Sequence, residues 1–183
     1  MLLNDNTKLA VWMFLGGEVI FFTTLILSFV LFRIENAPDY SAFKDHLNVP
    51  LVGVNTFILI TSSYLVVRAL DALHHDHQAH MQRYLFGVVL LGALFLAGQA
   101  YEWITLFNEG VGVTDLFGGE FFTVTGIHGL HVFTGLIWAV ILLILSRRRF
   151  LSADHNEPLE MFGLYWHFVD IVWIVLFTLF YLV

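Results

Sequence analysis

The chain has 183 residues, of which 58% are hydrophobic and only 13% are charged, and its mean hydropathy is +0.80. Soluble domains average about half apolar and a quarter charged residues, so this composition indicates a membrane protein. The net charge of −7 argues against a nucleic-acid partner, and the lack of cysteine excludes disulfides, thiolate metal sites and a cysteine nucleophile.

Five apolar segments are each long enough to cross a membrane, since a helix needs roughly 20 residues to span the hydrocarbon core. Backbone groups cannot stay unpaired in lipid, so each segment is expected to be a helix. The first is too long for a signal-peptide core and is expected to be retained. The fold class predicted is an all-α integral membrane protein, a five-transmembrane-helix bundle forming one domain over residues 1–183. We place the helices at about 9–32, 51–70, 84–107, 121–145 and 161–183.

The distribution of Lys and Arg predicts the orientation, because cytoplasmic flanks of transmembrane helices carry an excess of both. The N-terminal side of the membrane has six of the eight basic residues: Lys8, Arg68, Arg83, Arg147, Arg148 and Arg149. The opposite side has only Arg33 and Lys44. We therefore expect the N-terminus inside and the C-terminus outside.

The first helix carries an acidic residue near its middle, Glu18. An ionisable side chain at this depth is energetically costly and is a functional candidate by default. It has to face protein or internal water, where it can carry or sense a proton. The alternative interpretation is a neutral carboxyl that only hydrogen-bonds a neighbouring helix.

Other polar side chains fall into two layers. His167 and Asp170 lie near the start of the fifth helix, which enters from the same side as Glu18, so these three are expected to share the inner half of the membrane. His167 and Asp170 are three residues apart and therefore share one helix face. Glu102 and His128 form a second layer nearer the outer side, and we expect them to contact each other.

Two histidine motifs raise the question of metal or haem binding. GIHGLH (126–131) places His128 and His131 at i and i+3 on one helix, but a closed site needs further ligands. Close packing at the glycines, with the histidines as interhelical hydrogen-bond donors, is the favoured interpretation. HHDHQAH (74–80) can bind a divalent ion but has no fixed geometry, so a solvated loop is favoured. We therefore predict no metal site on this chain.

Several segments resemble subunit III of the haem-copper oxidases, the cytochrome c oxidase subunit 3 family. The resemblance is carried, in order, by GGEVIFF (16–22), GQAYEW (98–103), FFTVTGIHGLHVFTG (121–135) and YWHFVDIVW (165–173). PLVGVNTFILITSS in the second helix fits less specifically. The two N-terminal helices of the family's seven-helix form are missing, so the chain resembles its five-helix bacterial form.

The resemblance implies a multi-pass subunit of a bacterial plasma membrane that has no catalytic residue, haem or copper of its own. It implies packing with subunits I and II, where haem and copper are expected and O₂ is reduced to water, and association with further respiratory subunits. By motif, Glu18 is similar to the family's buried carboxylate, and we assign it to support of proton uptake. We assign an interhelical polar lock to His167, Asp170, Glu102, His128 and His131.

The resemblance also implies structural phospholipid and contact with membrane lipids. Phe14, one turn before Glu18, would lie beside a lipid. Arg147, Arg148 and His155 resemble the basic positions near lipid headgroups, and an arginine run at the end of a span suits anionic headgroups in any case. The absent helices form one wall of the family's lipid cleft, so the lipid sites are either shared with another subunit or lost.

Four alternatives stay open. Two are relatives, subunit III of a quinol oxidase and the subunit-III-like protein associated with nitric oxide reductases. A third is an independent proton carrier that uses Glu18, His167 and Asp170, although no inverted repeat typical of such transporters is visible. The fourth is a membrane cytochrome with His128 and His131 as haem ligands, which an absorption spectrum would reveal.

Overall fold

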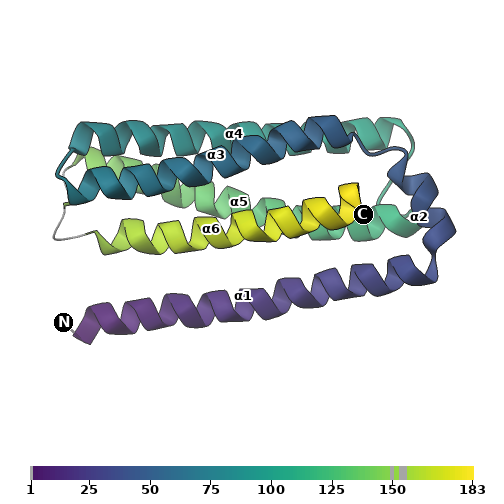
Figure 1. The fold of residues 1–183 in the computed structure, drawn as a ribbon, viewed down its shortest axis with the longest axis horizontal. Coiled ribbons are helices and arrows are strands. Elements are labelled where there is room, and N and C mark those ends of the chain that lie inside the picture. The colour runs from purple at the N-terminus through teal and green to yellow at the C-terminus, as the bar shows by residue number, and fades with distance from the viewer. Residues whose placement is uncertain (1, 149–150, 153–155) are drawn as a thin grey trace.

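The computed structural model describes residues 2–148, 151–152 and 156–183, and side chains from Lys8 onward. The described residues form helices and no strand. The long helices lie side by side and α1 occupies one edge of the bundle (Figure 1). The elements are α1 (Leu2–Glu35), α2 (Ala37–Lys44), α3 (Val49–His74), α4 (Gln78–Asn108), α5 (Leu116–Arg147), α6 (Glu157–Phe177) and the short π-helical segment η1 (Thr178–Leu182).

The predicted membrane bundle is confirmed, because five helices among the described residues are long and apolar enough to cross a bilayer. Most of them extend a few residues beyond the predicted limits, into the polar flanks where water and capping groups can satisfy helix ends. At the start of α3, for example, the Asn48 side chain accepts a 3.1 Å hydrogen bond from the Leu51 amide. The candidate spans are Lys8–Glu35, Val49–His74, Gln78–Asn108, Leu116–Arg147 and Glu157–Leu182.

The short helix α2 was not expected from the sequence. It lies in the connection between α1 and α3, at one end of the bundle (Figure 1). Its eight residues have no apolar run, but a proline in the first turn is favourable for a helix start. Its Tyr40 and Phe43 are buried and hold it against the bundle.

Helix α6 forms the centre of the bundle. In the most apolar stretch of 18 residues within α6 and η1, half of the residues are buried inside the chain. In the corresponding stretch of α1 only 17% are buried. Trp166 and Trp173 are fully buried, and their indole N–H groups donate to Ser62 at 3.0 Å and Thr56 at 2.9 Å. These hydrogen bonds satisfy the indoles and join α6 to α3 inside an apolar core.

Helix α5 approaches α6 at a glycine. A Cβ atom at Gly135 would stand 2.7 Å from the Trp166 ring and 3.1 Å from the Tyr165 ring. No side chain fits there without displacing these rings. Gly135 therefore permits the close crossing that places the histidines of α5 against α6 and α1.

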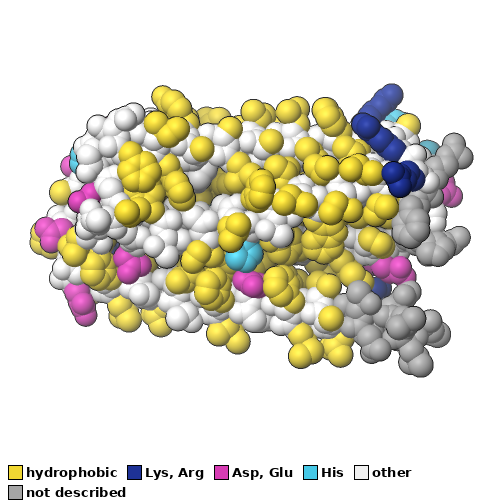
Figure 2. All heavy atoms as spheres, turned by 180° about the vertical axis from the view of Figure 1, so that it is seen from behind, with side chains coloured by type: hydrophobic (Ala, Val, Ile, Leu, Met, Phe, Trp, Pro, Cys, Tyr) yellow, Lys and Arg dark blue, Asp and Glu magenta, His cyan; other side chains and the backbone are white. Residues whose placement is uncertain are grey.

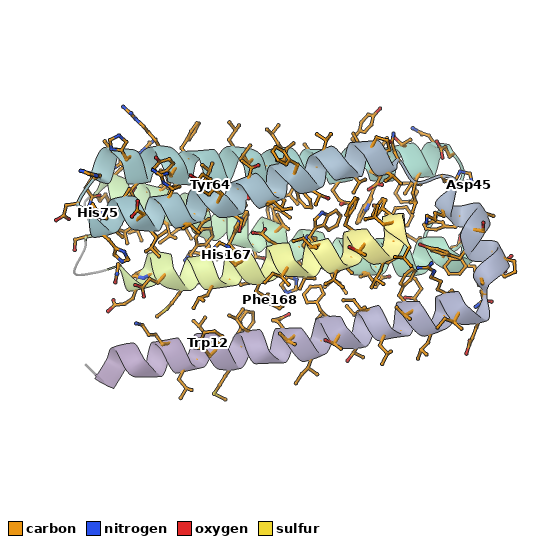
Figure 3. The ribbon with its side chains drawn as sticks, in the orientation of Figure 1. Trp12, Asp45, Tyr64, His75, His167 and Phe168 are labelled. Atoms are coloured by element: carbon orange, nitrogen blue, oxygen red, sulfur yellow. The ribbon has the colours of Figure 1, made fainter. Side chains whose placement is uncertain are left out.

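Helix α1 contacts α6, α5 and α2. Near one end, Phe29 packs on Phe180 with ring centroids 4.0 Å apart, and Arg33 donates to the backbone carbonyls of Leu179 (3.1 Å) and Val183 (2.5 Å). Nearer the middle, Phe22 packs edge-to-face on Phe168, 6.1 Å between centroids, and Figure 3 shows Phe168 on the side of α6 that faces α1. The first half of α1 is thus attached less extensively than the second.

Candidate functional site

The candidate site is a carboxyl–imidazole pair that joins α1 to α5. Oε2 of Glu18 lies 3.1 Å from Nε2 of His131. The two side chains are 18% and 17% exposed. The other ring nitrogen of His131, Nδ1, lies 2.8 Å from the backbone carbonyl of Ile127, and the Tyr165 hydroxyl donates to the His131 carbonyl at 2.9 Å. Both the ring and the backbone of His131 are therefore held in place.

A mostly apolar pocket of about 470 Å³ opens beside this pair, between α1, α5 and α6. Figure 2 shows hydrophobic side chains over the middle of one face, with a histidine and an acidic side chain adjoining among them. Phe14 stacks on Tyr165 across the pocket, 6.4 Å between centroids. Besides Glu18 and His131 the lining includes Val11, Phe14, Leu130, Thr134, Trp138 and Tyr165. The pair thus contacts a space that is lined mostly by apolar side chains.

The sequence predicts His167 and Asp170 as the neighbours of Glu18, whereas the hydrogen-bond partner in the structure is His131. The positions of the two residues along their helices would have identified His131 as the partner of Glu18. Glu18 lies about 26 Å before the end of α1 and His131 about 23 Å after the start of α5, at 1.5 Å per residue. Because α1 and α5 run in opposite directions, these positions are level. His131 lies on a helix that enters from the opposite side, so matching Glu18 only to the helix that enters from its own side misses this residue.

His167 and Asp170 lie on another face of α6. Nδ1 of His167 is 2.5 Å from the Ser63 hydroxyl oxygen, which links α6 to α3. His167 is labelled on α6 in Figure 3. Asp170, one turn further, is 4% exposed. An interhelical polar contact therefore exists at His167, and it involves α3 and not α1.

The expected contact between Glu102 and His128 is wrong. Oε2 of Glu102 accepts hydrogen bonds from the Tyr181 hydroxyl at 2.8 Å and from the Gln99 amide at 3.2 Å. The His128 ring instead stacks on Trp173, 4.9 Å between centroids, and neither of its nitrogens has a hydrogen-bond partner among the described residues. His128 faces the aromatic core at α6, whereas Tyr181 and Gln99 occupy the position next to Glu102.

The histidines of the described residues do not gather into a ligand set. His128 and His131 face different neighbours, Trp173 and Glu18. In the α3–α4 turn, His74 lies 2.7 Å from the Asn156 amide, and Nδ1 of His75 lies 2.9 Å from the Asp71 carbonyl. Over the part of the chain that the structure describes, no group of three or more His, Asp or Glu side chains is arranged to hold a metal ion.

The residues predicted to bind lipid lie in separate places. Phe14 lines the pocket beside Glu18. Arg147 lines another, of about 460 Å³, together with Arg83 and Phe86 between α4 and α5. Arg148 is exposed at the end of α5. His155 lies outside the described residues. The structure thus does not join Phe14 and Arg147 into one cleft.

The sequence matches a known protein family over its whole length. The family model for Cytochrome c oxidase subunit III matches residues 1–183. This chain belongs to that family. The cytochrome c oxidase subunit 3 of Bacillus subtilis (strain 168) is 37% identical over 98% of this chain and 87% of its own length. That of Bacillus sp. (strain PS3) is 35% identical over 98% and 86%. A probable quinol oxidase subunit 3 of Staphylococcus aureus (strain USA300) is 34% identical over 98% and 90%.

The resemblance noted in the sequence is therefore confirmed. This subunit III is part of a haem-copper oxidase, a respiratory enzyme complex, and associates with other subunits of that complex. The five candidate spans in the described part of the chain and the bacterial relatives make it a multi-pass protein of the plasma membrane. The relatives include proteins named cytochrome c oxidase subunit 3 and proteins named probable quinol oxidase subunit 3.

Proposed function

We propose that this subunit III packs against subunits I and II of a terminal oxidase and supports proton uptake by subunit I through Glu18. It has no catalytic role or redox centre of its own in this proposal, and haem and copper belong to the partner subunits. We also retain the orientation predicted by the basic residues, with the N-terminus inside. The observation that carries the proposal is the hydrogen bond of Glu18 to His131 within an apolar part of the bundle.

The chemistry of the pair supports a role with protons. Two ionisable groups inside a membrane span are costly, and a purely structural link between helices can be made with neutral amides or hydroxyls. A carboxyl paired with an imidazole can gain or lose a proton while its partner offsets part of the charge. Glu18 can therefore adjust charge and water near the uptake path without being an obligatory relay.

We further propose that phospholipid binds at two places on this subunit. The pocket at Phe14 is lined mostly by apolar side chains and suits an acyl chain. The groove between α4 and α5 combines Arg83 and Arg147 with apolar side chains and suits an anionic headgroup with part of its chain. Arg148 and His155 are the further headgroup candidates. Lipid analysis of purified complexes with Phe14→Ala or Arg147→Gln tests each place separately.

The test of the proton role is Glu18→Gln in the intact oxidase. We expect lower steady-state O₂ consumption and proton uptake, or a shorter lifetime during turnover, with normal haem content. The matched control is Glu109→Gln, because Glu109 also pairs with a histidine, His46, at 3.0 Å, but outside the spans in an exposed position. Normal assembly, turnover and lifetime of the Glu18→Gln complex at every pH would refute the role.

Purification in mild detergent tests the assembly itself. Recovery with subunits I and II, and O₂ uptake driven by reduced cytochrome c, supports a cytochrome c oxidase. Uptake driven only by quinol selects the quinol oxidase. Recovery of the chain alone and colourless would instead favour an independent proton carrier, for which proton flux into liposomes is the assay.

A further inference from the structure

The hydrogen bonds of His131 determine how many protons the pair holds. A backbone carbonyl only accepts, so Nδ1 of His131 carries the hydrogen that bonds to Ile127. Nε2 is then an acceptor in the neutral ring and a donor in the imidazolium, while an ionised carboxylate only accepts. The contact with Glu18 therefore needs a proton, either on the carboxyl or on Nε2. Both arrangements have no net charge.

We propose that Glu18 and His131 form a single proton-binding site whose proton fastens α1 to α5, so that loss of this proton releases α1. The inference rests on the proposed role of Glu18 in proton uptake and names His131 as the second half of that site. The width of the pocket beside the pair then depends on whether this proton is bound.

Removing the proton leaves two acceptors facing each other. The Nε2 lone pair and the Glu18 carboxylate would stand 3.1 Å apart, with a net negative charge next to apolar side chains. The nearby hydroxyls are already engaged, Tyr165 with the His131 carbonyl and Thr134 with the Leu130 carbonyl. Either hydroxyl would have to break its present hydrogen bond in order to donate to the pair. The contact is consequently repulsive in the deprotonated state.

Few other titratable groups face the pair. Tyr165 comes from α6, and His128 lies one turn before His131 on α5 with its ring against Trp173. On α1, Lys8 is some turns away and pairs with Glu160 of α6 at 3.7 Å. The described residues that line the pocket include no Lys, Arg or Asp. The charge of the pair is thus set mainly by its own proton.

The position of α1 depends on this one hydrogen bond because of where the helix is attached to the bundle. Arg33 holds the far end of the helix to the Leu179 and Val183 carbonyls. Phe22 packs on His131, 5.0 Å between centroids, as the next layer beyond Glu18. Toward the N-terminal side Leu15 is buried and Phe14 stacks on Tyr165, and beyond them remain the pocket and the partly exposed Lys8–Glu160 pair. The half of α1 before Glu18 is therefore the part that can move away from α5.

The test measures the distance between α1 and α5 in the intact oxidase as a function of pH. Spin labels at Met13→Cys and Ile137→Cys report it, because both side chains are exposed and this chain has no native cysteine. A complex without the introduced cysteines corrects for labelling of partner subunits. In the wild-type background we expect the distance to increase as the pH rises.

Three variants make the result specific. Glu18→Gln supplies an amide donor to Nε2 that does not titrate, so the distance should stay short at every pH. His131→Gln likewise offers a donor to the Glu18 carboxylate and should behave in the same way. Glu18→Ala removes the contact and should give the long distance at every pH.

A wild-type distance that does not change with pH, or a Glu18→Gln complex that follows the wild-type curve, would overturn the inference. Oxygen consumption in the same complexes separates this result from the proposed function. Impaired turnover of Glu18→Gln with a pH-independent wild-type distance would refute the single-proton link alone. A pH-dependent wild-type distance with normal assembly, turnover and lifetime of the Glu18→Gln complex would refute the uptake role alone.

Discussion

The Tyr181 hydroxyl donates a 2.8 Å hydrogen bond to Oε2 of Glu102 and so joins η1 to α4. Both residues are 2% exposed. The only other hydrogen bond to the Glu102 side chain within the described residues comes from Gln99 on the same helix. The buried Glu102 carboxyl on α4 therefore depends on η1 for one of its hydrogen bonds.

Replacing Tyr181 by Phe should lower the thermal stability of the purified oxidase. The change leaves a buried carboxyl short of a donor, which costs about 1–3 kcal/mol. Thermal release of this subunit from the complex is the measurement. Tyr101→Phe is the matched control, because Tyr101 lies on α4 but is 61% exposed. Equal midpoints for the two variants would contradict the role of the hydrogen bond.

Gly135→Ala should weaken the crossing of α5 and α6. The added methyl group would collide with the Trp166 ring at 2.7 Å, and overpacking of this kind costs about 1–3 kcal/mol. Gly129→Ala is the control on the same helix, because its Cβ meets nothing within 4 Å. We expect reduced yield and stability for the first and no loss for the second. A Gly135→Ala complex as stable as the control would show that the rings move aside easily.

His128 should tolerate phenylalanine better than alanine. Its ring is 1% exposed and stacks on Trp173, and its nitrogens have no protein partner among the described residues. Phenylalanine keeps the aromatic contacts, whereas alanine leaves a cavity that costs about 3–5 kcal/mol, the range for deleting a buried aromatic ring. Assembly yield and thermal stability are the readouts. A strong loss with His128→Phe would show that an imidazole nitrogen is needed.

Arg33→Gln should loosen the far end of α1. The guanidinium donates to the Leu179 and Val183 carbonyls and lies over the Tyr40 ring, 4.3 Å from its centroid. Losing charged hydrogen bonds costs about 1.5–3 kcal/mol. Because these hydrogen bonds also hold the segment that contains Leu179 and Val183, limited proteolysis near residue 183 should become faster. Arg68→Gln is the control, since Arg68 is exposed and, among the described residues, donates hydrogen bonds only to tyrosine hydroxyls. Equal cleavage rates in both variants would refute the prediction.

Tyr40 should contribute to loss of stability at alkaline pH. Burial raises the pKa of this tyrosine above its usual value of 10.0, and the charge of Arg33 opposes the rise only in part. The folded protein thus holds the phenol proton more tightly than the unfolded chain, so stability falls as the pH rises past about 10. Tyr40→Phe should show a weaker decline than wild type when thermal midpoints are compared from pH 8 to 11. Parallel declines would contradict this.

The sequence alone determined the number and type of the long helices. A stretch of about 20 apolar residues in lipid can satisfy its backbone hydrogen bonds as a helix without help from other segments. Composition and length therefore predict a helix there without tertiary information. The motifs around Glu18, Glu102, His128 and Asp170 were also sufficient to indicate the family, which the match over residues 1–183 confirms. The short helix α2 lacks such a run and depends on the buried contacts of Tyr40 and Phe43.

Only the tertiary structure decided which polar groups meet. Helix depth places Glu18, His131 and His167 in broad layers, but the rotation of each helix about its axis determines the face on which a side chain lies. That rotation is set by packing, for instance by Gly135 against Trp166 and by Trp173 bonded to Thr56. Glu18 therefore contacts His131, and His128 contacts Trp173. Sequence spacing allows several neighbours for each of these side chains, and the steric fit between the helices selects one of them.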